Sequence, residues 1–209
     1  MRQGSLVSHE TRDRVRGWAV PVAMALGRLG LTPNALTILG FVGTCVAAVA
    51  AGAQAWALAG VLVLFFGIFD MFDGALARAT GRSSRFGAFL DSTLDRTGEN
   101  LVLTGTALGL AFAGHAVAAG LAALAMAFSS MVTYTRAKAE SLGVHGEVGI
   151  SPRPERLVLI GGGLIAAGFT EPDPFPLALA LSIIAAVSAI TVVQRIVHVR
   201  KQLNQQENP

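Results

Sequence analysis

The stretch from Asp70 to Asp95 reads DMFDGALARATGRSSRFGAFLDSTLD and contains four aspartates. Asp70 and Asp73 are three residues apart and Asp91 and Asp95 are four apart, so on helices each pair lies on one face. A Gly-Arg-Ser-Ser segment at 81–84 separates the two predicted helices. Because the connection is short, the two helices can bring all four carboxylates into one space.

Carboxylates gathered in this way repel one another, and burial strengthens the repulsion. A divalent cation relieves it, and hard oxygen ligands favour Mg2+ or Mn2+ over zinc. Two ions about 3.5 to 4 Å apart suit a displacement reaction at phosphorus, and a neighbouring carboxylate can accept the proton of an attacking hydroxyl. Asp95 lies deepest on its helix. We therefore predict two Mg2+ or Mn2+ ions at the four aspartates, with Asp95 as the catalytic base.

The composition is that of an integral membrane protein. The 209 residues are 53% hydrophobic and only 14% charged, with a mean hydropathy of +0.58, whereas roughly a quarter of residues are charged in soluble proteins. Since a span needs about 20 apolar residues, the length allows about five to seven spans. The single Cys45 excludes a disulfide framework. The N-terminal residues lack an apolar core followed by a cleavage site, so no signal peptide is expected.

Hydropathy divides the chain into six predicted transmembrane helices. Thr32 suits the N-cap and Pro33 the first position of the first helix, and Ser83 or Ser84 can cap the third. The apolar run 55–69 is too short to cross alone, so the second helix must continue through the first two aspartates. The predicted helices span about 34–53, 55–79, 85–113, 116–141, 156–168 and 175–199.

The ends of the chain differ from this core. Residues 1–33 mix arginines with apolar residues, which predicts an amphipathic helix in the membrane interface, although an ordinary basic flank fits the pattern equally well. Residues 34–201 form the predicted membrane domain, and 202–209 are a predicted disordered tail. The predicted fold class is an all-α integral membrane protein with six transmembrane helices and an N-terminal amphipathic juxtamembrane helix.

The positive charges predict the orientation in the membrane. All 16 Lys and Arg residues fall in the N-terminal region, near the second and fourth connections, or near the C-terminal end, and the other connections have none. By the positive-inside rule, both termini and the aspartate site face the cytoplasm. We therefore predict a multi-pass protein of the cell (inner) membrane.

Two functions of other classes fit parts of the pattern. Charged residues within a membrane cost at least about 2.5 kcal/mol each and mark function by default. A divalent-cation transporter would also use clustered carboxylates, but the four lie at one end of their helices, no inverted repeat is present, and Arg78 beside them would repel a passing cation. A non-catalytic membrane scaffold would need no metal at all.

Eight positions match the pattern D-x2-D-G-x2-A-R-x8-G-x3-D-x3-D, and through them the sequence resembles the CDP-alcohol phosphotransferase family. These positions are Asp70, Asp73, Gly74, Ala77, Arg78, Gly87, Asp91 and Asp95. The resemblance implies six transmembrane helices, a homodimer, and a reaction in which an alcohol attacks the diphosphate of a CDP-linked lipid and releases CMP. It also implies that the first three aspartates hold metals that grip the diphosphate and that the fourth is both a ligand and the general base.

The resemblance also implies where the CDP-lipid binds. Two glycines of the pattern give the nucleotide close access, and the start of the first helix is similar to a nucleotide-contacting LTPN element of the family, in keeping with phosphate binding at helix N-termini. The implied contacts are Asn34, Thr37, Gly74, Ala77, Arg78, Ser84 and Gly87.

A second cationic set suggests the acceptor alcohol. It comprises Arg136, Lys138, Arg153, Arg156 and Arg195, all at predicted cytoplasmic helix ends. Arginine suits bidentate capture of phosphate, which predicts a phosphorylated acceptor, although for any one of them a positive-inside flank is as good an explanation. The segments TYTRAKAE and PRPERL resemble the bacterial phosphatidylinositol-phosphate synthases of this family, which implies CDP-diacylglycerol and inositol 1-phosphate as substrates. Glycerol 3-phosphate, the acceptor of phosphatidylglycerophosphate synthases, is the main alternative, and no nucleic-acid partner is expected.

Overall fold

The computed structural model describes residues 20–146, 148–150 and 153–207. Within these ranges the chain consists of helices and short connections, with no strand, which confirms the all-α class. A helical segment at 20–28 comes first. The helices that follow are α2 (Pro33–Gly52), α3 (Trp56–Gly67), α4 (Phe69–Ala79), α5 (Arg85–Phe112), α6 (Ala116–Ser141), α7 (Arg153–Thr170) and α8 (Phe175–Glu207).

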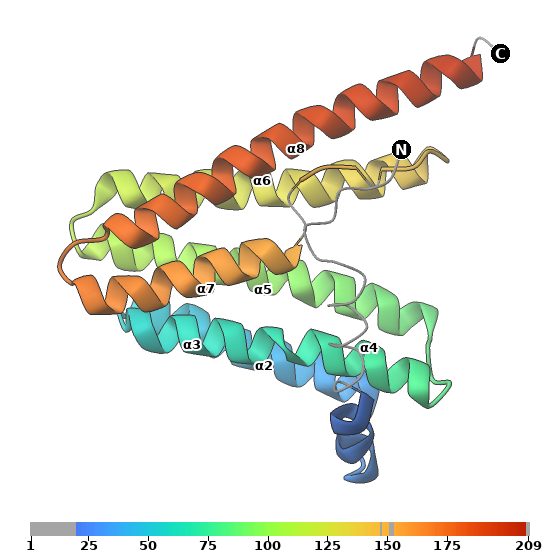
Figure 1. Cartoon of the computed structure of the whole chain (residues 1–209), viewed down its shortest axis with the longest axis horizontal. Helices are drawn as coiled ribbons and strands as arrows, with labels where there is room; N and C mark the ends of the chain where they lie inside the picture. Colours follow the sequence, from blue (N-terminus) through green and yellow to red (C-terminus); the bar gives the residue numbers. More distant parts are fainter. Residues whose placement is uncertain (1–19, 147, 151–152, 208–209) are drawn as a thin grey trace.

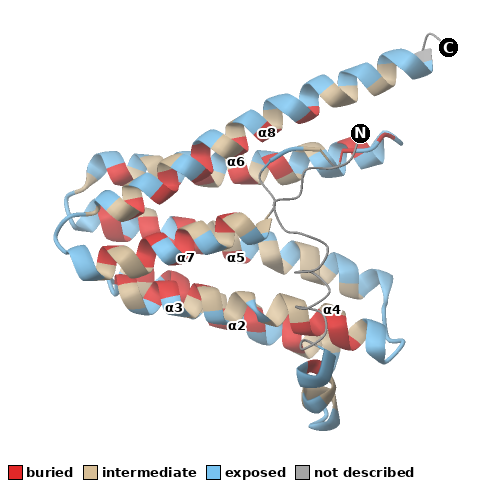
Figure 2. Cartoon of the chain, viewed as in Figure 1, coloured by how far each residue is buried: buried red, intermediate tan, exposed pale blue. Residues whose placement is uncertain are grey.

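The long helices pack as a closed ring (Figure 1). Going round it, α2 packs against α3, α3 against α7, α7 against α8, α8 against α6, α6 against α5, and α5 against α2 again. Helix α4 continues beyond α3 and packs against α2. Buried residues follow the faces that the helices turn toward one another, as Figure 2 shows. The ring places the start of α2, all of α4 and the starts of α5 and α7 at the same end of the bundle.

Small residues allow the closest of these contacts. A Cβ at Gly105 of α5 would lie 2.1 Å from the carbonyl oxygen of Ala48 in α2. A Cβ at Gly60 of α3 would lie 2.5 Å from the carbonyl oxygen of Gly161 in α7. Because membrane helices gain little from the hydrophobic effect when they associate, such close approach is a main source of their packing energy.

The outer surface suits a lipid environment. Four described segments are long and apolar enough to cross a membrane: α2, α3 together with α4, α6, and α8. Large apolar side chains project outward, for example Val49 and Val117, whose exposed fractions are 73% and 82%. Helices α5 and α7 contain too many charged residues to be counted among these four segments. The four apolar segments support a membrane protein, and the total of six spans stays a prediction.

Both predicted helix caps are confirmed. The Thr32 hydroxyl accepts a hydrogen bond from the Ala35 N–H at 3.2 Å, with Pro33 at the first position of α2. The Ser84 hydroxyl accepts one from the Gly87 N–H at 2.9 Å at the start of α5. Each cap satisfies a backbone donor that the first helical turn leaves unpaired.

Three boundaries differ from the prediction. The second predicted helix is interrupted at Ile68, which separates α3 from α4. Helix α7 begins at Arg153 rather than near Arg156. Helix α8 continues to Glu207, so most of the tail predicted to be disordered is helical.

The side chain of Gln202 gives a physical reason for this extension of α8. It donates to the carbonyl of His145 at 2.7 Å and accepts from the N–H of His145 at 3.1 Å. The two bonds fasten the end of α8 to the connection that follows α6. Gln, Leu and Glu also favour helix over coil.

The ends of the chain are described in part. The segment 20–28 packs through Ala23 against Leu36 of α2 and against Phe72 and Leu76 of α4. The remainder of the predicted interfacial helix, with Arg12, lies outside the described residues, and so do residues 208–209 of the predicted tail. The predicted interfacial helix therefore stays a prediction.

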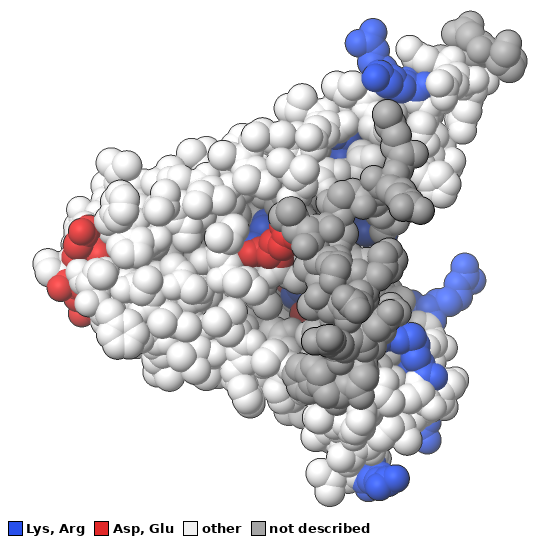
Figure 3. Space-filling model, in the orientation of Figure 1, with Lys and Arg blue, Asp and Glu red and all other residues white. Residues whose placement is uncertain are grey.

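The charges separate along the bundle (Figure 3). Lys and Arg side chains gather at the end that carries α4 and the C-terminal part of α8. The connection at the opposite end, between α7 and α8, contains Glu171 and Asp173 and no Lys or Arg. The positive-inside rule predicts the orientation in the membrane from this uneven distribution of Lys and Arg.

Candidate active site

A narrow pocket inside the basic end of the bundle collects the polar residues of four helices. Its volume is about 30 Å³, and its polar lining includes Thr37 of α2, Asp70 of α4, Asp95 of α5 and Arg153 of α7. The remaining walls are largely apolar side chains and glycines. These residues come from distant parts of the sequence, and the helix ring brings them to one point.

The four aspartates form one electrostatic cluster. Asp73 is buried and interacts with both Asp70 and Asp91, and Asp95 interacts with all three of the others. The hydroxyl of Thr37 donates to Asp73 Oδ2 at 2.6 Å, which fixes that carboxylate against α2. The predicted convergence of the four carboxylates on one region is therefore present in the structure.

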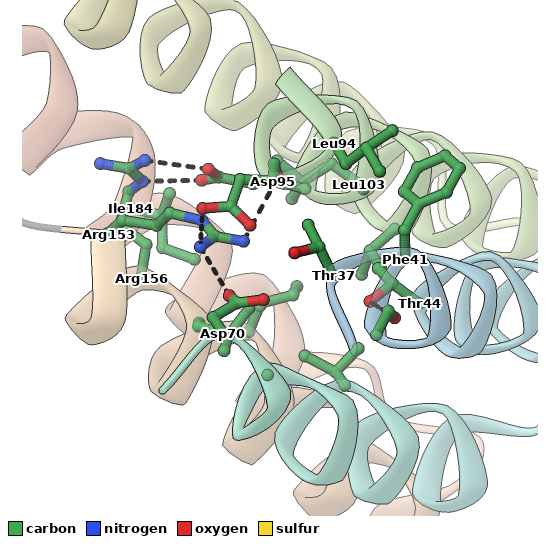
Figure 4. A pocket seen from close by; sticks show the side chains of 18 residues that line it. Thr37, Phe41, Thr44, Asp70, Leu94, Asp95, Leu103, Arg153, Arg156 and Ile184 are labelled. Carbon is green, nitrogen blue, oxygen red and sulfur yellow. Dashed lines mark hydrogen bonds and ion pairs between the residues drawn. The ribbon is translucent and has the colours of Figure 1, made fainter. Parts of the chain in front are cut away.

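An arginine lies between two of these carboxylates (Figure 4). Arg153 Nη1 donates to Asp70 Oδ2 at 2.6 Å and also to Asp95 Oδ2. Nη2 reaches the backbone carbonyl of Asp95 at 3.4 Å, and Nε is buried without a hydrogen-bond partner. One guanidinium thus supplies positive charge between an acidic residue of α4 and one of α5.

The cluster fits a divalent cation by the chemistry of its donors. Carboxylate oxygens are the ligands that Mg2+ and Mn2+ prefer, and no Cys or His lines this pocket. In the part of the chain that the structure describes, no three acidic, His or Cys side chains stand close enough to hold an ion together. Arg153 lies between two of the four carboxylates, with one nitrogen atom contacting both Asp70 and Asp95.

The residues expected to contact the nucleotide form two small groups beside the cluster. A Cβ on Gly87 would lie 3.0 Å from Ser84 Oγ and 3.2 Å from Asn34 Oδ1, so the N-terminal ends of α2 and α5 meet at this glycine. A Cβ on Gly74 would lie 3.2 Å from Arg78 Nη1. A side chain at either position would crowd these polar groups, and the contacts of both glycines with a nucleotide stay a prediction. Ala77 lies on α4 between Gly74 and Arg78 and is half-buried.

Arg156 forms a separate buried ion pair one turn further along α7. Its Nε and Nη2 donate to the two carboxylate oxygens of Glu99 at 2.7 and 2.9 Å. The side chains are only 6% and 10% exposed. A bidentate pair of this kind joins α7 to α5 and gives Arg156 a bracing role that the sequence pattern did not suggest.

The rest of the second cationic set lies elsewhere. Arg136 pairs with Glu140 on the exposed surface of α6 at 2.8 Å. Lys138 and Arg195 line a groove of about 400 Å³ between α6 and α8. Arg195 is buried and donates to the carbonyl oxygens of Val148, at 2.7 Å, and Val132. The five predicted phosphate-binding residues are therefore divided between the aspartate pocket, the groove and the surface.

Two pairings in the pocket had no signal in the sequence. Arg153 is 83 residues away from Asp70, and Arg156 is 57 residues away from Glu99. The sequence showed only that two arginines, with Glu155 between them, come directly before an apolar run, and this does not identify their partners. Which acidic residues they face depends on α7 packing between α3 and α8, which spacing within one helix does not reveal.

Comparison with known proteins assigns the family. The chain is 40% identical over 196 residues to the phosphatidylinositol phosphate synthase of Cutibacterium acnes, a match that covers 88% of this chain and 95% of that protein. Two crystal structures of the phosphatidylinositol phosphate synthase of Mycobacterium tuberculosis superpose with a TM-score of 0.80 at 35% identity. One has CDP-DAG bound, and the match covers 87% of this chain and 92% of that one. The other is a complex with manganese and citrate, and the match covers 87% of this chain and 88% of that one. Residues 30–197 match the CDP-alcohol phosphatidyltransferase family, to which this chain belongs.

Proposed function

We propose that this protein transfers the phosphatidyl group of CDP-diacylglycerol to a hydroxyl of inositol 1-phosphate, giving phosphatidylinositol phosphate and CMP. Family membership and relatives with this activity in their names support the proposal over a cation transporter or a scaffold. The observation that carries it is the gathering of four carboxylates from α4 and α5, two of them bonded to Arg153, at the basic end of an apolar bundle.

Asp70, Asp73, Asp91 and Asp95 would hold the metal, which we propose to be two Mg2+ or Mn2+ ions. When bound, the ions would neutralise charge on the diphosphate and on the oxygen that leaves with CMP. The crystallised relative from Mycobacterium tuberculosis contains manganese. The hydrogen bond from Thr37 would hold Asp73 in a fixed orientation, which lowers the cost of ordering the ligands.

The donor would bind beside the aspartates rather than in the narrow pocket, because about 30 Å³ is far too small for a nucleotide. At Gly74 and Gly87 the lack of a side chain would let the nucleotide approach the helix backbone. The side chains of Asn34, Ser84 and Arg78 lie next to these glycines, so they would contact the cytidine diphosphate. Amide and hydroxyl groups can bond to the base and sugar, and a guanidinium suits phosphate.

Asp95 would act as the general base. Its carboxylate would accept the proton of the acceptor hydroxyl while that oxygen bonds to the phosphorus that carries the diacylglycerol. The bond between this phosphorus and the bridging oxygen of the diphosphate breaks, and CMP leaves with that oxygen. Asp95 lines the pocket and lies against Arg153, so an acceptor phosphate bound by this arginine would bring its hydroxyl close to the base.

The predicted acceptor contacts Arg136, Lys138, Arg153, Arg156 and Arg195 stay proposals. Among them, Arg153 is the one in direct contact with Asp95. Glycerol 3-phosphate also carries a phosphate that Arg153 could bind, and it is the alternative acceptor. The homodimer and the cytoplasmic position of the site are likewise proposed, from the resemblance and from the charge asymmetry.

The experiment uses the purified protein in vesicles containing CDP-diacylglycerol and Mg2+. Inositol 1-phosphate, free inositol and glycerol 3-phosphate are supplied separately, and the lipid products are identified by mass spectrometry. We expect phosphatidylinositol phosphate with the first acceptor and little product with free inositol. Faster formation of phosphatidylglycerol phosphate would show that the proposed acceptor is wrong.

A further inference from the structure

Arg153 occupies the place where two of the proposed metal ligands face each other. Its Nη1 contacts a carboxylate oxygen of Asp70 and one of Asp95 at the same time, and Figure 4 shows its guanidinium directed between these side chains. The side chain of Arg153 is 29% exposed, and those of the two aspartates are 25% and 16% exposed. A partly buried cation therefore already offsets part of the negative charge of two of the four carboxylates.

A guanidinium and a divalent ion compete for these oxygens. Both are attracted by the same negative charge, and a carboxylate that bonds to a metal has less charge left for a hydrogen bond. With two divalent ions bound, the charge of the four carboxylates would be balanced, and Arg153 would stand next to other cations. The attraction that holds it between Asp70 and Asp95 would then be lost.

Several N–H donors of Arg153 make a long hydrogen bond or none. A guanidinium has five N–H groups, and its strongest contacts are paired bonds to two oxygens of one anion. Here Nη1 is shared between two carboxylates, Nη2 makes a long bond of 3.4 Å to a carbonyl, and the buried Nε has no partner. Arg156, by contrast, has the paired geometry with Glu99. Of the two arginines at the start of α7, Arg153 is the one suited to exchange partners.

We propose that Arg153 is an internal counter-cation that holds Asp70 and Asp95 until divalent metal displaces it, and that the displaced guanidinium then binds the phosphate of the acceptor. This inference rests on the proposed function, because it takes the metal ligands and a phosphorylated acceptor from there. It goes further by coupling the two events. Metal binding releases the group that binds phosphate, and phosphate removes the group that competes with metal, so each must strengthen the other by the same factor.

The test measures Mn2+ binding to metal-free protein in detergent, by titration calorimetry and by the electron paramagnetic resonance signal of free Mn2+. Arg153→Gln removes the competing charge and keeps a polar side chain. The control is Arg96→Gln, because Arg96 is exposed and interacts with Asp91 but makes no hydrogen bond to Asp70 or Asp95. It thus removes an equal charge close to the cluster.

We expect Arg153→Gln to bind Mn2+ more tightly than the unmodified protein, by about 5- to 150-fold, the usual range of coupling between two sites. Arg96→Gln should gain clearly less than Arg153→Gln, because it removes a nearby charge but frees no oxygen of Asp70 or Asp95. Adding inositol 1-phosphate should tighten Mn2+ binding in the unmodified protein by a similar factor and leave it unchanged in Arg153→Gln. Arg153→Lys, which keeps the charge, should show little of the gain.

Equal or weaker Mn2+ binding by Arg153→Gln would overturn the inference, because it would make Arg153 neutral or helpful to the metal. An equal gain in Arg96→Gln would also overturn it, since net charge and not contact would then set the affinity. If the unmodified protein and all variants bound no Mn2+, the proposed metal site itself would be wrong. This last result is distinct from a failure of the coupling alone.

Discussion

Replacing Glu99 with leucine should destabilise the protein strongly. The substitution keeps the approximate volume of the side chain and removes the two hydrogen bonds, of 2.7 and 2.9 Å, that Arg156 makes to this carboxylate. Because both side chains are at least 90% buried, the arginine loses its counter-charge where water cannot replace it. Breaking such a buried pair costs about 3 to 5 kcal/mol of unfolding free energy.

This magnitude is large enough to measure in detergent. A chain of about this size loses roughly 2 to 4 °C of melting temperature per kcal/mol, so the midpoint should fall by about 6 to 20 °C. The variant Glu99→Leu with Arg156→Met replaces both charges by apolar groups and should recover most of the loss. Glu140→Gln, which breaks an exposed pair with Arg136, should change stability by about 1 kcal/mol or less.

The same variants distinguish two roles of Arg156, which are joining α7 to α5 and binding the acceptor phosphate. If Arg156 serves mainly to join α7 to α5, the double variant should regain both stability and the KM for inositol 1-phosphate. If Arg156 also binds the acceptor phosphate, the double variant should be stable and have a raised KM. A single Glu99→Leu variant that melts within about 2 °C of the unmodified protein would refute the reasoning about the buried pair.

Three further predictions follow from the site and the packing. Asp95→Asn should lower kcat by about 10²- to 10⁴-fold, the usual contribution of a general base, and full activity would rule out that role. Thr37→Val removes the hydrogen bond to Asp73 and should lower the free energy of unfolding by about 1 to 3 kcal/mol in thermal melts, and no change would mean that water replaces the hydroxyl. Gly105→Ala forces a methyl group against a backbone carbonyl of α2 and should destabilise by about 1 to 3 kcal/mol, whereas Gly120→Ala meets open space and should not destabilise; equal melting temperatures would contradict the close packing.

Local sequence signals predicted much of the fold. Polar caps at Thr32 and Ser84 marked helix starts that the structure has. The aspartate spacing predicted that four carboxylates would share one region, and they do. These features depend on neighbours within one or two helical turns, where periodicity is informative.

Features that depend on tertiary packing could not be predicted in this way. The interruption at Ile68 has no Pro or Gly at the position itself, and the extension of α8 depends on bonds between Gln202 and His145, 57 residues apart. The partners of Arg153 and Arg156 depend on the placement of α7 in the ring. A cation at a helix end looks the same in the sequence whether it faces lipid, a carboxylate or a substrate.

The central claim is that the carboxylates of α4 and α5 carry out metal-dependent phosphatidyl transfer. The most direct measurement is the rate of CMP release by the purified protein in vesicles containing CDP-diacylglycerol, with Mg2+ and inositol 1-phosphate supplied together and then each omitted. We predict release only with both present, restored after chelation by added Mg2+ or Mn2+, and lost in Asp91→Asn. Full-rate release by the chelated protein, or by the Asp91→Asn variant, would contradict the account.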